Sequence, residues 1–224
     1  QGTVVFTFVG TATGFEESGS WVVSGVASSF PAGATISDID NDGFSEIITF
    51  INNKLYVWSA GGELLNGFPV TVDSGTVGTI PAIADFDKDG FKEIVAQGGS
   101  YLYLIKYDGT ILWTKVIKTF SMSPVIGDVD KDGELEIVSV ESNGGDSNSI
   151  KIFDFEGNEE NSWVIGVSNI EYDSPALADL DNDGDLEIIV GSNDWKLYAW
   201  NHDGSLVSGW PQLTGGYISS SPAI

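Results

Sequence analysis

Four acidic nonapeptides contain the residues best suited to chemistry in this sequence. They read DIDNDGFSE, DFDKDGFKE, DVDKDGELE and DLDNDGDLE, and we call them acidic loops 1 to 4 (38–46, 85–93, 128–136 and 179–187). Calcium takes about six to eight oxygen ligands from carboxylates and backbone carbonyls. A chain that turns tightly at position 6, which is glycine in every copy, would bring such oxygens together. The pattern therefore predicts one calcium site in each loop.

The predicted ligands occupy positions 1, 3, 5, 7 and 9 of each loop, and position 7 contributes its backbone carbonyl. Without a cation, carboxylates held this close would repel one another and raise one another's pKa, so folding of each loop is expected to depend on metal. Calcium is favoured over magnesium because so many protein oxygens suit the larger ion. The predicted set is Asp38, Asp40, Asp42, Phe44, Glu46, Asp85, Asp87, Asp89, Phe91, Glu93, Asp128, Asp130, Asp132, Glu134, Glu136, Asp179, Asp181, Asp183, Asp185 and Glu187.

An EF-hand loop begins in the same way and is the main alternative for these segments. It requires a glutamate at position 12 and a helix after the loop. The sequence has β-branched segments there, and position 12 is Thr49, Ala96, Ser139 or Val190. The EF-hand alternative is therefore excluded. A shell filled by carboxylates leaves little room for a substrate, so the predicted role of the metal is structural.

The elements that must position these loops recur with the same period. The first aspartates are separated by 47, 43 and 51 residues, which matches one four-stranded propeller blade per repeat. Each loop follows a short apolar stretch and precedes a β-branched run, an alternating aromatic strand, a glycine-containing turn and a last strand such as ILWTKV or SLVSGW. We predict an all-β fold, a β-propeller of four-stranded blades that forms a single domain over 1–224, with repeats at about 31–70, 79–117, 122–167 and 173–213.

Both ends of the sequence have the pattern of half-repeats. Residues 1–26 resemble the late part of the third repeat, and residues 219–224 resemble the opening strand of another one. The end segments could complete a fifth blade together, or the chain could be part of a longer propeller. A third alternative is self-association, in which the end strands pair between molecules because exposed sheet edges promote association.

The composition excludes several classes of partner. Nine lysines and arginines oppose 33 acidic residues, and the formal net charge is −24. No basic surface can neutralise the phosphates of a nucleic acid or the headgroups of anionic lipids. No apolar stretch is long enough for a membrane-spanning helix, and the absence of cysteine removes disulfides and thiolate metal sites. We expect neither nucleic-acid binding nor membrane insertion.

The repeats resemble FG-GAP (VCBS-type) repeats, the blades of integrin α-subunit propellers and of many secreted microbial proteins. In that family the motif DxDxDGxxD binds calcium in the loop between the first two strands of a blade. This sequence departs from the motif at position 9, which is glutamate in all four loops, and it has fewer blades than is common in the family. The resemblance implies about four Ca²⁺ ions, a secreted or cell-surface location, and a protein or glycan ligand.

Three functions remain as alternatives. We expect an extracellular, calcium-stabilised module for binding, adhesion or structural assembly, with a carbohydrate-binding lectin as the alternative and a polysaccharide lyase as a less favoured one. No catalytic residues are predicted, and the single histidine, His202, is expected in a surface turn rather than in an active site.

Trp58 and Trp200 are expected in the core. Trp195 falls in a turn, where an exposed ring could stack on a sugar or anchor a protein partner.

Overall fold

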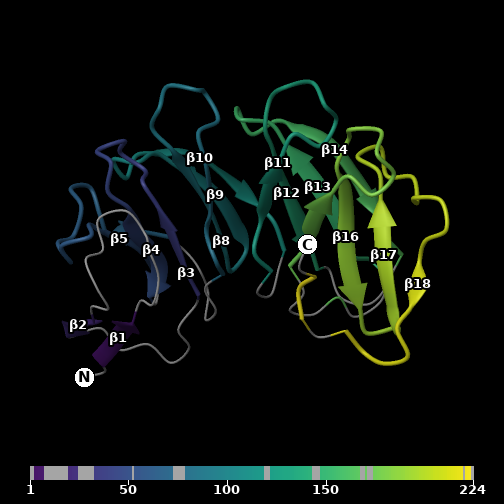
Figure 1. Ribbon diagram of the computed structural model, residues 1–224, viewed down its shortest axis with the longest axis horizontal. Helices are drawn as coiled ribbons and strands as arrows, with labels where there is room; N and C mark the ends of the chain where they lie inside the picture. Colours follow the sequence, from purple (N-terminus) through teal and green to yellow (C-terminus); the bar gives the residue numbers. More distant parts are fainter. Residues whose placement is uncertain are drawn as a thin grey trace. The chain divides into compact units, whose positions relative to one another are not determined.

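The computed structural model describes residues 3–7, 20–24, 33–51, 53–72, 79–118, 122–142, 147–166, 170, 174–218 and 220–222. These residues form strands β1 to β18 and no helix (Figure 1). The strands make four four-stranded antiparallel sheets and one two-stranded sheet. Within the described residues, no helix has the length and hydropathy that crossing a membrane requires. The predicted all-β class is confirmed.

The chain divides into two compact units, residues 1–114 and 115–224. Blade 1 and nearly all of blade 2 belong to the first unit, and each strand of a blade pairs with the next strand along the chain. Their strands are β3 (Ala34–Ser37), β4 (Glu46–Ile51), β5 (Lys54–Trp58) and β6 (Val70–Thr71) in blade 1, and β7 (Ala82–Ala84), β8 (Glu93–Gly98), β9 (Tyr101–Ile105) and β10 (Ile111–Val116) in blade 2.

The second unit contains blades 3 and 4, which have the same meander topology. Their strands are β11 (Val125–Gly127), β12 (Glu136–Glu141), β13 (Ser149–Phe153) and β14 (Glu159–Val164) in blade 3, and β15 (Ala176–Ala178), β16 (Glu187–Ser192), β17 (Lys196–Trp200) and β18 (Gln212–Leu213) in blade 4. The four predicted repeats thus correspond to four sheets. That all of them form one domain over 1–224 stays a prediction.

The second and third strands of the blades form the core of each unit. Strands β4, β8 and β16 are buried along their whole length, which explains their runs of isoleucine and valine without a polar face. In the first unit, residues of blades 1 and 2, such as Ile48 and Ile94, share one hydrophobic cluster. In the second unit, Val138 and Ile188 share the corresponding cluster of blades 3 and 4. Neighbouring blades within a unit therefore bury their faces against each other.

The alternating aromatic pattern of the third strand builds a stack on one strand face. Tyr56 lies on Trp58 with ring centroids 5.0 Å apart, and Tyr198 lies on Trp200 at 5.2 Å. Trp58 is 6% exposed and Trp200 is 4% exposed. The prediction that these two tryptophans belong to the core is confirmed.

The outer strands differ between blades. Strands β10 and β14 have six residues each, as predicted for ILWTKV, whereas β6 and β18 have two. The predicted last strand of blade 4, SLVSGW, makes only an isolated bridge between Trp200 and Leu206, and pairing resumes at Gln212. Gly209 has a φ of +89°, and Pro211 has no backbone N–H to donate to the ladder, so the strand cannot continue through this segment.

The predicted N-terminal half-repeat forms a hairpin. Strand β1 (Thr3–Thr7) pairs antiparallel with β2 (Ser20–Ser24), and Phe6 lies opposite Trp21. This pairing corresponds to that of β13 with β14 in blade 3, as the sequence similarity predicted. Pro31 and most of the connections around these strands lie outside the described residues. So do Ser219, Ala223 and Ile224, and the strand predicted over 219–224 stays a prediction.

Candidate metal sites in the acidic loops

The acidic loops connect the first two strands of each blade, and two residues in each loop have a left-handed backbone. The glycine at position 6 has a φ of +90° to +98° in the four loops, which confirms the predicted turn. The residue at position 4 is also left-handed, a feature that the sequence analysis missed. It is Asn41, Lys88, Lys131 or Asn182, with φ between 58° and 65°. These two residues wrap the loop around its own carboxylates.

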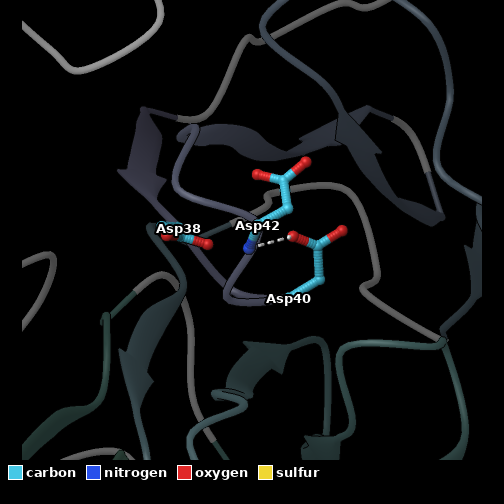
Figure 2. A group of neighbouring side chains, drawn as sticks. All are labelled: Asp38, Asp40 and Asp42. Atoms are coloured by element: carbon cyan, nitrogen blue, oxygen red, sulfur yellow. Dashed lines mark hydrogen bonds between the residues drawn. The ribbon is translucent and has the colours of Figure 1, made fainter.

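Backbone N–H groups inside each loop bind the aspartates at positions 1 and 5. In loops 1 to 3 the position 1 carboxylate accepts a hydrogen bond from the N–H of the glycine, at 3.1, 3.0 and 3.1 Å. In loop 4 Asp179 accepts from Asn182 at 2.7 Å instead. The position 5 carboxylate accepts from the N–H of position 7 at 2.8 to 3.0 Å in all four loops. Figure 2 shows Asp38, Asp40 and Asp42 of loop 1, with the Asp42 N–H donating to Asp40 at 3.3 Å.

The glutamate at position 9 begins the second strand of each blade and is buried. Glu46, Glu93, Glu136 and Glu187 are 0 to 3% exposed. One carboxylate oxygen of each, Oε2, accepts a hydrogen bond from the N–H of position 2, at 2.9, 3.1, 2.7 and 2.5 Å in loops 1 to 4. The longer side chain of glutamate thus reaches back across the loop and fixes its first residues. Sequence reasoning predicted this residue only as a ligand.

Carboxylate oxygens converge in every loop. In loops 2 to 4 one oxygen each from positions 1, 3 and 9 lies within 4.8 Å of the others, and in loop 1 the corresponding group comes from positions 1, 3 and 5. The predicted ligands at positions 1 and 3 are therefore together in all four loops. The complete predicted sets, with the position 7 carbonyl, stay a prediction.

Each loop also contains a buried carboxylate oxygen that has no hydrogen-bond partner among the described residues. These oxygens are Asp38 Oδ1, Glu93 Oε1, Asp128 Oδ1 and Glu187 Oε1. A buried, unpaired charged group is strongly unfavourable, and buried charges in proteins are normally paired or bound to metal. The residues present therefore fit a hard cation, which would supply the missing partner in all four loops.

Comparison with known proteins agrees with this repeated geometry. Residues 128–190, which extend from the start of loop 3 into the strand after loop 4, match the family of FG-GAP-like repeats. The chain carries an FG-GAP-like repeat. Comparison with curated proteins gave no match.

Solved structures with a similar fold are β-propellers and related proteins. The crystal structure of BBS1N in complex with ARL6DN has a TM-score of 0.59 at 17% identity, over 86% of this chain and 57% of that one. The C-terminal WD40 domain of Sif2 has a TM-score of 0.52 at 20% identity, over 85% of this chain and 48% of that domain. This chain thus spans about half the length of these propellers, and its four described blades have a propeller-like fold.

Burial sets the electrostatics of the acidic loops. It raises the pKa of Glu46 and of Glu136 from the usual 4.5 to about 7, despite the stabilising backbone hydrogen bond, and repulsion from the loop aspartates adds to the rise. The pKa values of Glu93 and Glu187 are raised for the same reason. Burial and the charge of Asp42 also raise the pKa of Asp40. A divalent cation would remove this penalty by favouring the charged forms.

In loops 2 and 4, the side chain at position 7 contacts the turn between the third and fourth strands and braces the loop against it. In loop 2, Phe91 stacks on Tyr107 with ring centroids 4.3 Å apart. In loop 4, Asp185 Oδ2 lies 3.2 Å from Nδ1 of His202, which stands at the position corresponding to Tyr107. In loop 1 the corresponding turn residue is Ala60, and Phe44 is 52% exposed. Loops 2 and 4 thus make the same kind of contact with the turn through different side chains, and His202 takes part in that of loop 4.

Loops 3 and 4 are linked directly. The Nζ of Lys131, at position 4 of loop 3, donates a hydrogen bond of 2.5 Å to the backbone carbonyl of Asp183 in loop 4. A Cβ atom at Gly184 would lie 2.1 Å from this Nζ and would displace the end of the lysine side chain, and the φ of +98° at this position favours glycine. A lysine of the neighbouring repeat thus holds the backbone of loop 4.

Proposed function

We propose that this chain is a calcium-stabilised β-propeller module that works outside the cell in binding, adhesion or structural assembly. Each acidic loop holds one calcium ion, bound by the carboxylates that converge there. The observation that carries this proposal is the recurrence, in all four loops, of a buried carboxylate oxygen without a hydrogen-bond partner. An unpaired buried carboxylate oxygen in every loop is explained by a cation that binds in every loop.

The donor set supports calcium rather than a transition metal. Loops 1 to 4 offer carboxylate and carbonyl oxygens and contain neither histidine nor cysteine. Oxygen-only sites suit hard cations, and flexible shells with many protein ligands suit calcium better than magnesium. When bound, the ion supplies positive charge to the buried glutamate at position 9 and the aspartates at positions 1 and 3. The glutamate then holds the loop to the start of the second strand.

A structural role also supports an extracellular location and a non-catalytic function. Extracellular calcium modules commonly have weak sites, which are filled because free calcium is abundant outside cells. The loop carboxylates are bound to the loop's own backbone, an arrangement that stabilises the turn. The proposed module presents its ligand surface, for a protein or a glycan, elsewhere on the blades.

Thermal unfolding with and without calcium tests this proposal. Ligand binding to the native state stabilises it by about 2.7 kcal/mol per site when free calcium exceeds its Kd by roughly a hundredfold. We expect the Tm to fall when a chelator is added and to recover when excess calcium, but not magnesium, is restored. A melting curve that is the same with chelator and with calcium would contradict the proposal.

A further inference from the structure

Trp195 is an exposed aromatic residue that the calcium sites do not explain. It is the last residue of the turn between β16 and β17 and is 49% exposed. Its ring packs edge-to-face against that of Tyr217, with ring centroids 5.9 Å apart and an angle of 86° between the ring planes. Tyr217 itself is 72% exposed. Two large rings thus stand together at the surface of blade 4.

The backbone at Trp195 is unfavourable for a residue of this type. Its φ is +70°, in the left-handed region that glycine and asparagine adopt readily and bulky residues rarely adopt. Unfavourable backbone conformations are concentrated at sites with a function.

Blade 1 has a turn at the same place that is one residue shorter and lacks the ring, since Ile51 pairs with Lys54 whereas Ser192 pairs with Lys196. Asn53 precedes Lys54 in the segment NKLYVW, as Trp195 precedes Lys196 in WKLYAW. The carbonyl of Asn53 accepts a hydrogen bond from the N–H of Val72 at 3.0 Å, and the carbonyl of Trp195 accepts one from Thr214 at 2.9 Å. The two residues therefore have the same backbone role, and asparagine is sufficient for it.

The surroundings of the two rings are open, and their charges balance. A Cβ atom added at Gly215 or Gly216, just before Tyr217, would meet nothing within 4 Å. Beside Trp195, the Asp194 carboxylate lies 3.3 Å from the Lys196 Nζ and accepts a hydrogen bond of 2.7 Å from the hydroxyl of Tyr198. The two charged residues that flank Trp195 in the sequence therefore form an ion pair with no net charge.

We propose that Trp195 and Tyr217 form a stacking site for a neutral glycan. The two rings offer an area on the order of 300 Å², which suits sugar residues and is well below the roughly 800 Å² that each partner buries in a stable protein interface. The formal net charge of −24 disfavours anionic polysaccharides. This inference rests on the proposed role as a binding module.

Affinity electrophoresis of the full chain in calcium tests the site. The native gels contain laminarin, xyloglucan, galactomannan or dextran as neutral probes, and alginate as the anionic one. We expect at least one neutral polysaccharide to retard the wild type, and Trp195→Asn and Tyr217→Ser each to weaken this binding by at least about tenfold. Val164→Ser, at a residue that is 66% exposed on β14, is the matched control and should bind like the wild type.

The variants also separate loss of binding from loss of structure. Trp195→Asn places the blade 1 residue in the blade 4 turn, so its Tm in calcium should equal or exceed that of the wild type. Absence of retardation by every neutral probe, or retardation that Trp195→Asn leaves unchanged, would overturn the proposal. Concentration-dependent dimers that Trp195→Asn abolishes would instead assign the rings to a protein contact and also overturn it. A Tm that responds to chelator in any of these cases leaves the calcium proposal standing.

Discussion

Strand β16 connects two regions of blade 4 that differ in kind. Glu187 at its start belongs to acidic loop 4, and the turn after Ser192 at its end contains Trp195. The loop is one of four copies with the same backbone turns and the same hydrogen bond from position 2 to the buried glutamate. In blade 1 the residue that corresponds to Trp195 is Asn53, so this ring is not repeated there.

The acidic loop is a feature that blade 4 shares with the other blades, whereas Trp195 distinguishes blade 4 from blade 1. The loop side chains point to their own backbone and to one another, so any cation bound there serves the repeat itself. Trp195 is half-exposed, and the carbonyl of Asn53 in blade 1 accepts the same kind of backbone hydrogen bond as the carbonyl of Trp195. Repeated features therefore stabilise the fold, and the departure from the repeat is the place to look for a ligand.

The largest effect should come from removing the charge at the loop end of β16. In calcium, Glu187→Gln should lower the free energy of unfolding by about 3 kcal/mol, because one ion is lost and its stabilisation with it. In chelator the same substitution should raise the Tm, since it removes a buried charge that has no counterion. Thermal melts of both proteins in both buffers measure the reversal. The same sign of effect in both buffers would show that Glu187 does not bind metal.

Lowering the pH should reduce the difference in stability between the metal-free and the calcium-loaded protein. The folded-state pKa of Glu46 and Glu136 is about 7 and their usual value is 4.5, so the metal-free fold binds these protons more tightly than the unfolded chain does. Its stability should therefore be greatest below pH 4.5 as far as these groups are concerned, and should fall as the pH rises through 7. Protons also compete with calcium for the carboxylates.

Melts of demetallated protein at pH 8, 7 and 6, with and without added calcium, measure this dependence. We expect the calcium-induced rise in Tm to be largest at pH 8 and smallest at pH 6. A rise that grows as the solution becomes more acidic would contradict the assignment of these glutamates to the sites.

The braces at position 7 should give a smaller effect that differs between loops. Phe91→Ala removes a ring stacked on Tyr107 and should lower the free energy of unfolding by about 1 kcal/mol beyond the lost burial. Phe44→Ala, in the loop whose turn has Ala60, should change it by less than about 0.5 kcal/mol. Urea unfolding in calcium compares the two. Equal losses would show that the stack does not brace loop 2.

The smallest effect on stability is expected at the turn end of β16. Trp195→Asn should leave the free energy of unfolding in calcium unchanged or raise it by up to about 1 kcal/mol, because asparagine tolerates a positive φ better. Urea unfolding measures this change next to Glu187→Gln. A clear destabilisation would mean that the ring packs as part of the fold, and would weaken the comparison between the two ends of the strand.

The fold could be predicted from the sequence because its determinants are local and repeated. The glycine at position 6, the buried β-branched run and the aromatic strand recur in four copies, and each specifies one step of the meander. The last strand of blade 4 could not be placed correctly, because SLVSGW has a strand-like composition while Gly209 and Pro211 interrupt its pairing. The sequence signal for this interruption was Pro211, two residues after Gly209.

The loop chemistry could be predicted by residue type, and its details could not. Carboxylates at odd positions indicated a cation, but nothing in the spacing showed that Glu93 would also accept a hydrogen bond from Phe86. The contact between Asp185 and His202 joins residues from two strand connections, and only the folded blade brings them together. The exposed position of Trp195 was predicted, whereas its left-handed backbone and its contact with Tyr217 required the structure.

Counting bound calcium on the intact chain tests the central claim most directly. Native mass spectrometry of protein dialysed against calcium should show four ions on the wild type and on Trp195→Asn, and three on Glu187→Gln, because the four acidic loops bind independently of the aromatic turn. A wild type without specifically bound calcium, or a Glu187→Gln variant that keeps all four ions, would contradict the account.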